Sequence, residues 1–333
     1  MLNHWLYIYF AVLYLISVEA DRYSHGRPIY RYKRIIGGYP IKAGTYPWAV
    51  SIQAVRYPGI RGIFRRNKEH YCGAALIEPD WVVTAAHCLY NEDESERLIS
   101  FLDPKMWHVR MASEKLRPNM IERVKGWFRR AYNFILGDVK PQPFYHVKKI
   151  FHHPNYNPGN LEYDIALFQL KETPILKKLN NLDLIELPDP VTEANWPAAG
   201  QTCIAVGWGC SFNDGPPTLV GRSVHLPVLS PSVCRKMYAS YINLTSTQEF
   251  CAGFQNENKG ICPGDSGGPL VCKASDGELK LAGIVSATHS YHPADFPAIF
   301  TRVSYFSSWI RSVIKSNPSE YRNSWFSFLH GPK

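Results

Sequence analysis

Three short motifs carry side chains that could together perform nucleophilic catalysis. His87 lies in the run Thr-Ala-Ala-His-Cys, Asp164 begins Asp-Ile-Ala-Leu, and Ser266 lies in Gly-Asp-Ser-Gly-Gly-Pro. Hydrolysis of a peptide bond at neutral pH requires a nucleophile, a base that takes its proton, a group that orients this base, and donors for the oxyanion that develops. The serine, the histidine and the aspartate are candidates for the first three parts.

The chain around these motifs contains short segments rich in β-forming residues, separated by clusters of glycine, proline and asparagine. This pattern is typical of a β-sandwich or β-barrel. Residues 187–197 contain several prolines and are the candidate crossing between two halves. The clearest predicted strands span residues 48–55, 81–84, 203–206 and 281–285.

Helical periodicity is clear near the end of the chain, where apolar residues repeat at three- and four-residue steps after Ser304. We therefore predict one amphipathic helix that closes the fold, with Ser304 as its N-cap. The tail beyond residue 317 keeps several aromatic residues but has no period. The apolar positions of the helix are Phe306, Trp309, Ile310, Val313 and Ile314.

The ends and the composition predict an exported globular protein. The chain has 333 residues, of which 45% are hydrophobic and 20% charged, as in ordinary globular proteins. Residues 1–20 carry an apolar run that ends in small residues, the pattern of a secretory signal peptide. A membrane anchor is the alternative, but the run is shorter than the roughly 20 residues that a spanning helix needs. Residues 21–34 are polar and basic, and we expect them to be a removable segment.

Export predicts an oxidising compartment, and eight cysteines are an even number that suits complete pairing in disulfides. The spacings Cys-x-x-Cys and His-Glu-x-x-His, which are typical of metal sites, do not occur in the sequence. We therefore expect no metal and no cofactor. Asn243 begins the one glycosylation sequon, Asn-Leu-Thr.

At these motifs the chain resembles the trypsin/chymotrypsin-type serine peptidases, over residues 35–317. The chain order His, Asp, Ser also differs from the orders in subtilisins and α/β-hydrolases. The resemblance implies an all-β fold of two six-stranded antiparallel β-barrels with a C-terminal α-helix. It implies a secreted serine endopeptidase made as a zymogen, with residues 1–20 as signal peptide, 21–34 as activation propeptide and 318–333 as a C-terminal tail.

The resemblance assigns a role to each site residue. Ser266 Oγ would attack the scissile carbonyl, His87 would take and return the proton, and Asp164 would fix the imidazole tautomer. The backbone N–H groups of Gly264 and Ser266 would form the oxyanion hole, and a glycine suits the unusual backbone turn at position 264. Ser286 matches the family position beside the triad that also lines the substrate strand.

The resemblance also predicts activation by cleavage between Arg34 and Ile35. In the family, cleavage before a run such as Ile-Ile-Gly-Gly, which begins at Ile35, frees an α-amine that folds inward. The amine pairs with the aspartate beside the nucleophile, here Asp265, and this pair builds the oxyanion hole and the substrate pocket. Residues 31–34, Arg-Tyr-Lys-Arg, fit a trypsin-like and a furin-type activating protease equally, so the sequence leaves the activator open.

The substrate pocket departs from the trypsin pattern. In trypsins an aspartate six residues before the nucleophile binds Lys or Arg, and here that position is Gly260. Without a carboxylate, burying a cationic side chain is costly, so we expect apolar rather than Lys or Arg side chains at the cleavage site. Thr288 and Ala298 align with wall positions that are glycine in trypsins, and Ile261 narrows the base. A small to medium pocket follows, elastase-like or chymotrypsin-like.

Further departures surround this pocket. Ala287 stands where the family usually has a tryptophan, and Pro263 replaces a more usual polar residue at the rim. Residues 289–296 lack the cysteine that normally bridges to Cys262. We expect a non-standard disulfide between Cys210 and Cys262, since the segment around Cys210 runs near the nucleophile loop in this fold; two unpaired thiols are the alternative. The family pairs are Cys72–Cys88, Cys203–Cys272 and Cys234–Cys251.

Two enlarged loops are basic. Residues 117–149 lengthen the segment between the catalytic histidine and aspartate, replace the usual acidic calcium loop, and mix basic with aromatic side chains. Residues 56–68 add further arginines. The two loops lie side by side in the family and the formal net charge is +9, so they could bind heparin-like glycans, an acidic stretch of a protein substrate or a membrane surface. Two solvated loops without a partner are the alternative.

A catalytically silent homologue that binds partners through its surface is the main alternative function. The complete triad and Gly264 argue against it, whereas Pro263, Ala287 and Thr288 are compatible with it. A nucleic-acid-binding function fits less well, because the sequence contains no recognition module. The expected partners are protein or peptide substrates and an activating protease, in the extracellular space.

Overall fold

The computed structural model describes a subset of the chain. The predicted signal peptide and propeptide (residues 1–34), Asn243 of the sequon, the greater part of both basic loops and nearly all of the tail lie outside the described residues. The described residues are 35–56, 67–92, 98–111, 114–116, 145–157, 161–171, 184–212, 215–239, 244, 247–289, 292–293 and 295–318.

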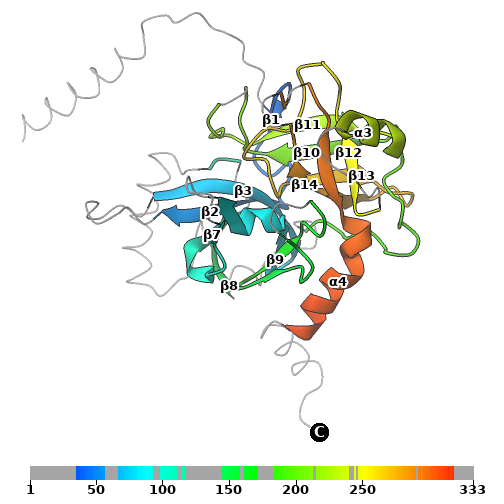
Figure 1. The fold of residues 1–333 in the computed structure, drawn as a ribbon. Coiled ribbons are helices and arrows are strands. Elements are labelled where there is room, and N and C mark those ends of the chain that lie inside the picture. The colour runs from blue at the N-terminus through cyan, green and yellow to red at the C-terminus, as the bar shows by residue number, and fades with distance from the viewer. Residues whose placement is uncertain are drawn as a thin grey trace, which may run out of the picture. The chain divides into compact units, whose positions relative to one another are not determined.

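The first half of the described chain forms a closed antiparallel barrel in the strand order β2-β3-β4-β9-β8-β7 (Figure 1). The hairpin β2–β3 carries a register shift after Ile52, which bends it as barrel closure requires. These strands are β2 (Ala49–Arg56), β3 (Asn67–Glu78), β4 (Trp81–Thr84), β7 (Trp107–Arg110), β8 (Tyr145–His152) and β9 (Ala166–Leu170), beside a small sheet of β5 (Tyr90–Glu92) and β6 (Leu98–Ser100).

The second half forms a seven-stranded sheet in the order β1-β11-β10-β13-β14-β15-β12. Its last six strands also close on themselves, because Val228, next to β11, bridges Ala252 of β12. The all-β prediction of two antiparallel barrels is confirmed, with β1 as an added seventh strand. The strands are β1 (Tyr39–Pro40), β10 (Thr202–Gly207), β11 (Arg222–Pro227), β12 (Glu249–Ala252), β13 (Pro269–Lys273), β14 (Leu279–Ala287) and β15 (Ala298–Arg302).

The predicted C-terminal helix is α4 (Val303–Ser316), but Ser304 is not its cap. The helix follows β15 directly, so its N-cap is Arg302, which makes no side-chain capping bond. Ser304 lies inside the first turn, where its buried Oγ reaches the carbonyls of Ala194 and Trp196 instead. Short 3₁₀ turns span Ala86–Leu89 (η1) and Pro104–Met106 (η2).

A second helix, α3 (Pro231–Tyr238), was missed by the sequence analysis. Its start has an ordinary signal, since Ser230 accepts a hydrogen bond from the Val233 amide and Pro231 occupies the first turn. Only two of its eight residues are buried, too few for an apolar period to show. Neither helix among the described residues is long and apolar enough to cross a membrane.

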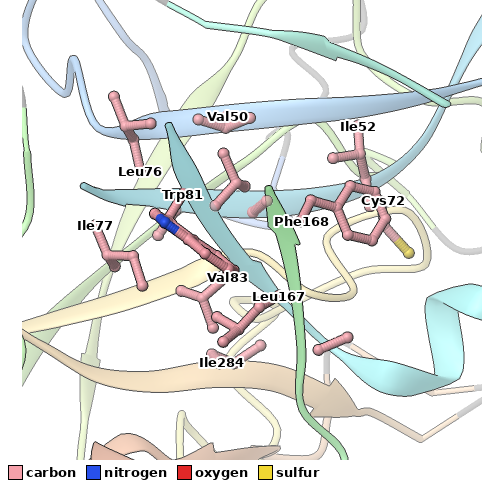
Figure 2. Close-up of a cluster of buried hydrophobic side chains, with 14 of the residues drawn as sticks. Val50, Ile52, Cys72, Leu76, Ile77, Trp81, Val83, Leu167, Phe168 and Ile284 are labelled. Carbon is pink, nitrogen blue, oxygen red and sulfur yellow. The ribbon is translucent and has the colours of Figure 1, made fainter. Parts of the chain in front are cut away.

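The first barrel has a continuous apolar core that extends into the second half of the fold. Figure 2 shows Val83 and Leu167, from paired strands of the first barrel, close to Ile284 of β14. Phe306 and Ile310 of α4 belong to the same cluster, so the amphipathic face of the helix is buried there. This shared core holds the two halves together, and with them the loops at their junction.

A short segment of the chain bonds to both halves of the fold. Just before residues 187–197, the amide of Ile185 donates to Leu76 O in β3, and the carbonyl of Glu186 accepts from Leu281 N in β14. The chain therefore contacts both halves within two residues.

Candidate active site

Strand pairing brings the predicted base and its orienting carboxylate together. Thr84, the last residue of β4, pairs with Ala166, the first residue of β9. His87 follows the first of these strands in η1, and Asp164 precedes the second, so both lie at the same end of the pair. His87 Nδ1 lies 2.8 Å from Asp164 Oδ2, and the His87 amide donates to Oδ1 at 2.8 Å.

The carboxylate of Asp164 is buried and held from both halves of the fold. Only 1% of the residue is exposed. Ser286 Oγ donates to Oδ2 at 2.6 Å, and Thr301 Oγ1 donates to the Asp164 carbonyl at 2.9 Å. With the two bonds from His87, the carboxylate accepts three hydrogen bonds, which leaves little freedom to its orientation.

These contacts determine the protonation state of the imidazole. A carboxylate oxygen only accepts, so Nδ1 of His87 carries a hydrogen and Nε2 is left as the basic nitrogen. Burial lowers the pKa of His87, but the charge of Asp164 and the hydrogen bond to it outweigh this effect, and the pKa is raised overall. A raised pKa suits a group that must hold a proton transiently.

The predicted nucleophile lies on a turn that requires glycine on both sides. Gly264 and Gly267 have φ angles of +95° and +74°, which L side chains rarely adopt. A Cβ atom at Gly267 would lie 2.2 Å from Thr84 Oγ1. The amide of Gly73 in β3 donates to Ser266 O at 2.7 Å, so the first barrel touches the nucleophile residue directly.

Asp265, beside the predicted nucleophile, is buried. Its carboxylate is buried and accepts hydrogen bonds from the amides of Gly209, at 2.7 Å, and Cys262, at 3.0 Å. Burial raises the pKa of Asp265 to about 7, and the two amide bonds offset part of the effect. Ile35 is fully buried, and the carbonyl of Ile36 accepts from the Gly260 amide at 2.9 Å.

His70 is a further site residue, and it was missed by the sequence analysis. Its Nε2 lies 2.8 Å from Gly264 O, and its Nδ1 lies 2.8 Å from Ser51 Oγ. Burial lowers the pKa of His70 to about 4, with the Gly264 bond acting in the opposite direction, so the ring is neutral at pH 7. Because a carbonyl only accepts, Nε2 carries the hydrogen and Nδ1 accepts from the serine hydroxyl.

The pocket residues approach one another closely. A Cβ atom at Gly260 would lie 2.7 Å from Pro293 O, so this carbonyl occupies the space that a larger side chain would need. Thr288, the residue after β14, has its Oγ1 3.5 Å from the carbonyl oxygen of Ile261, in the segment before the nucleophile. Ala298 is buried in β15.

All eight cysteines are paired in the structure. One of the four bonds joins Cys210 to Cys262, where the sequence analysis expected a non-standard bridge. Cys72, His87 and Cys88 lie close enough to share a metal ion, but both sulfur atoms are in a disulfide and the imidazole is bound to Asp164. The other bonds are Cys72–Cys88, Cys203–Cys272 and Cys234–Cys251.

Comparison with known proteins gives one consistent family. The Trypsin family model matches residues 35–108 and 123–310. The chain is 30% identical to a trypsin of Xenopus laevis over 286 residues, 85% of this chain and 92% of that protein. It is 30% identical to a trypsin of Squalus acanthias over 283 residues, 85% of this chain and 97% of that protein. The serine protease filzig of Drosophila melanogaster is also 30% identical, but the match covers only 15% of it.

Proposed function

Because this chain belongs to the trypsin family and is a serine-type endopeptidase, we propose that Ser266, His87 and Asp164 are its catalytic triad. His87 Nε2 takes the proton from Ser266 Oγ as this oxygen attacks the scissile carbonyl, and later gives it to the leaving amine. Asp164 keeps Nδ1 protonated and stabilises the imidazolium. The N–H groups of Gly264 and Ser266 stabilise the oxyanion.

The double contact between Asp164 and His87 carries this proposal. One carboxylate oxygen binds the ring at Nδ1 and the other binds the backbone amide of the same residue, both at 2.8 Å. These two bonds fix both the position and the tautomer of the ring, so that Nε2 is the nitrogen that can accept a proton. This arrangement also argues against a catalytically silent homologue.

Labelling with a fluorophosphonate after cleavage at Arg34 tests the triad. Only an activated serine reacts, so we expect one label, at Ser266, and none on Ser266→Ala. Turnover of Ser266→Ala should fall by a factor on the order of 10⁶. Ser307→Ala is the matched control, since Ser307 is buried in α4 and donates to Val303 O. A cleaved wild-type protein without label would contradict the proposal.

We further propose that the protein is a zymogen. Cleavage after Arg34 would free the α-amine of Ile35 to pair with Asp265. Two observations support this step: the Asp265 carboxylate is buried, and Ile35 is packed in the same second-barrel core as Ile261. A buried carboxylate without a cation is costly, which gives the new ammonium group a strong preference for this position.

The proposed pocket prefers apolar side chains over Lys and Arg. Gly260 offers no carboxylate, and the carbonyl of Pro293 closes the space beside it. Thr288 Oγ1 lies 3.5 Å from Ile261 O, so the segments that carry these two pocket residues are in contact. Small apolar side chains, as for an elastase-like enzyme, fit this arrangement best. Cleavage of a peptide library by the activated enzyme tests this, and cleavage confined to Lys or Arg would contradict it.

The domain organisation and location remain part of the proposal. Residues 1–20 would direct secretion, residues 21–34 would be removed on activation, and residues 318–333 would follow the protease domain of residues 35–317. Asn243 would carry a glycan. Four disulfides support an extracellular location, because such bonds persist in oxidising compartments.

The basic loops are proposed to bind polyanions such as heparin-like glycans. Support comes from the sequence alone, since residues 57–66 and 117–144 lie outside the described part of the structure. Binding to immobilised heparin should weaken steeply with added salt, because salt screens the attraction between exposed charges. Binding that is absent or insensitive to salt would contradict this part of the proposal.

A further inference from the structure

The Cys210–Cys262 disulfide lies beside the backbone that would form the oxyanion hole. Both cysteines are 1% exposed, and Ile36 packs against them in a small buried cluster. A second contact reinforces the bridge, because the Cys210 amide donates to Pro263 O at 2.9 Å. The segment that ends at Cys210 and the loop that leads to the nucleophile are therefore joined twice.

The two amides that donate to the Asp265 carboxylate lie at the two ends of this disulfide. One amide belongs to Cys262 itself, and the other belongs to Gly209, the neighbour of Cys210. The carboxylate lies flat against this glycine, since a Cβ atom at Gly209 would be 2.5 Å from Asp265 Cγ. Any separation of the two segments would pull one of the donors away from the carboxylate.

Gly209 also supports the predicted oxyanion donor. A Cβ atom at Gly264 would lie 3.1 Å from Gly209 Cα, so the two glycine backbones are in close contact. Gly264 has a φ angle of +95°. The contact with Gly209 and the hydrogen bond between its carbonyl and His70 both restrain it. A shift of Gly209 would therefore free the peptide whose N–H must face the developing charge.

From these contacts we propose that the Cys210–Cys262 disulfide is a positioning device for the oxyanion hole. It holds the amides of Gly209 and Cys262 on the Asp265 carboxylate and, through Gly209, keeps Gly264 in place. The inference rests on the proposed function, because it assigns the oxyanion donors to Gly264 and Ser266.

The disulfide supports the oxyanion hole and not the far wall of the pocket, which residues 289–296 form. Residues 289–296 contain no cysteine, so this wall has no covalent link to the nucleophile loop. Among the described residues, the Pro293 carbonyl lies beside Gly260 and the Thr288 hydroxyl reaches Ile261 O, and both contacts are noncovalent. Loss of the disulfide should therefore weaken stabilisation of the transition state more than binding of the substrate side chain.

The test compares Cys210→Ala/Cys262→Ala with Cys203→Ala/Cys272→Ala, after both are cleaved at Arg34. The two disulfides close loops of similar length, with sequence separations of 52 and 69, so their effects on the unfolded chain are matched. We expect kcat of the first variant to fall by about 10²-fold with KM near the wild-type value, the scale of losing one oxyanion donor. The control should keep kcat at temperatures where it is folded.

A pair of inhibitors separates positioning from general damage. A peptide aldehyde forms a tetrahedral adduct with an oxyanion, whereas the matching peptide alcohol only occupies the subsites. The variant without the bridge should bind the aldehyde about 10²-fold more weakly and the alcohol as well as wild type. Equal losses for both inhibitors, or no loss for either, would overturn the inference.

If the alanine pair does not fold, Cys210→Val/Cys262→Ala, which retains more of the buried volume, takes its place in the same assays. Wild-type enzyme serves as the reference for the proposed function. A cleaved wild type that fails to react with the fluorophosphonate contradicts the triad itself. A reactive wild type beside an equally active bridge-free variant contradicts only the positioning role.

Discussion

His70 Nε2 lies 2.8 Å from the carbonyl oxygen of Gly264, so a histidine of the first barrel holds the peptide that precedes Asp265 on the second. The same strand, β3, reaches the nucleophile again through the Gly73 amide and Ser266 O. Two bonds from one strand thus fix the nucleophile loop across the junction of the barrels. The chemistry depends on how the barrels pack, and not on the loop alone.

His70 is predicted to stay neutral throughout the neutral range. Its pKa is lowered to about 4 by burial, so its ring should not titrate between pH 5 and 8. Nitrogen-15 NMR of labelled histidine should show one non-titrating ring with the hydrogen on Nε2. A ring at this position that titrates near pH 6.5 would contradict the assignment.

The same pKa has a consequence for stability. Between about pH 6.5 and 4 the unfolded chain binds a proton at His70 that the folded chain does not, so the contribution of His70 is present above pH 6.5 and lost as the pH falls. The difference in unfolding free energy between wild type and His70→Gln should shrink on acidification, by at most about 1.4 kcal/mol per pH unit. Urea unfolding of both proteins at several pH values measures it, and a constant difference would refute the linkage.

Ser286→Ala should change the pH profile of the enzyme. Ser286 Oγ donates to Asp164 Oδ2 at 2.6 Å, and its loss leaves more negative charge facing His87. The pKa of His87 should rise further, so the acidic limb of kcat/KM moves to higher pH, while kcat falls by about 10-fold. Ser307→Ala is the control, since Ser307 is a buried serine whose hydroxyl donates to Val303 O and not to Asp164. An unchanged limb would show that Ser286 does not influence the base.

Thr288→Gly should widen the pocket. The change removes the side chain that reaches Ile261 O and frees the space between the two walls. Measured as kcat/KM on matched peptides, the preference for Leu or Phe over Ala at the cleavage site should rise by about 10-fold or more. Gly260→Asp is predicted not to create tryptic cleavage, because its side chain would meet Pro293 O. A profile that is unchanged in Thr288→Gly would place the specificity elsewhere.

The activated enzyme should lose activity in alkali. A free α-amine has a pKa of about 7.7 to 8.0, and pairing with the buried Asp265 raises it. The active form is therefore present below this raised pKa and lost as the pH rises through it. Steady-state kcat/KM should show an alkaline limb above about pH 8. Unchanged turnover well above that range would argue against the pair of Ile35 and Asp265.

The sequence by itself identified the parts of the site that lie in contiguous motifs. Ser266 lies between glycines that permit a sharp turn, and Gly264 and Gly267 have the positive φ angles that such a turn needs. The strand before His87, β4, was predicted from its apolar run, whereas β9 after Asp164 was not, although both strands are buried along their whole length. The sequence also shows directly that Gly260 stands at the position where trypsins have an aspartate.

Tertiary structure alone decided which distant groups support those motifs. His70 and Gly264 are 194 residues apart, and the residue types around His70 do not indicate that its ring bonds to a backbone carbonyl. The glycine at position 73 in a strand was the one available signal, because a glycine inside a strand often marks the close approach of another backbone. Here a Cβ atom would lie 2.7 Å from Gly268 Cα.

The contacts of Ser304 and of the pocket residues could likewise not be predicted from the local sequence. Ser304 has the residue type of a helix cap, but the helix starts directly from β15 and its hydroxyl reaches the crossing segment instead. The carbonyl of Pro293 reaches Gly260 only because the chain folds back over it. Residue types and short spacings determine which chemistry is available. The packing of remote segments determines which hydrogen-bond donors and which pocket walls surround the predicted nucleophile.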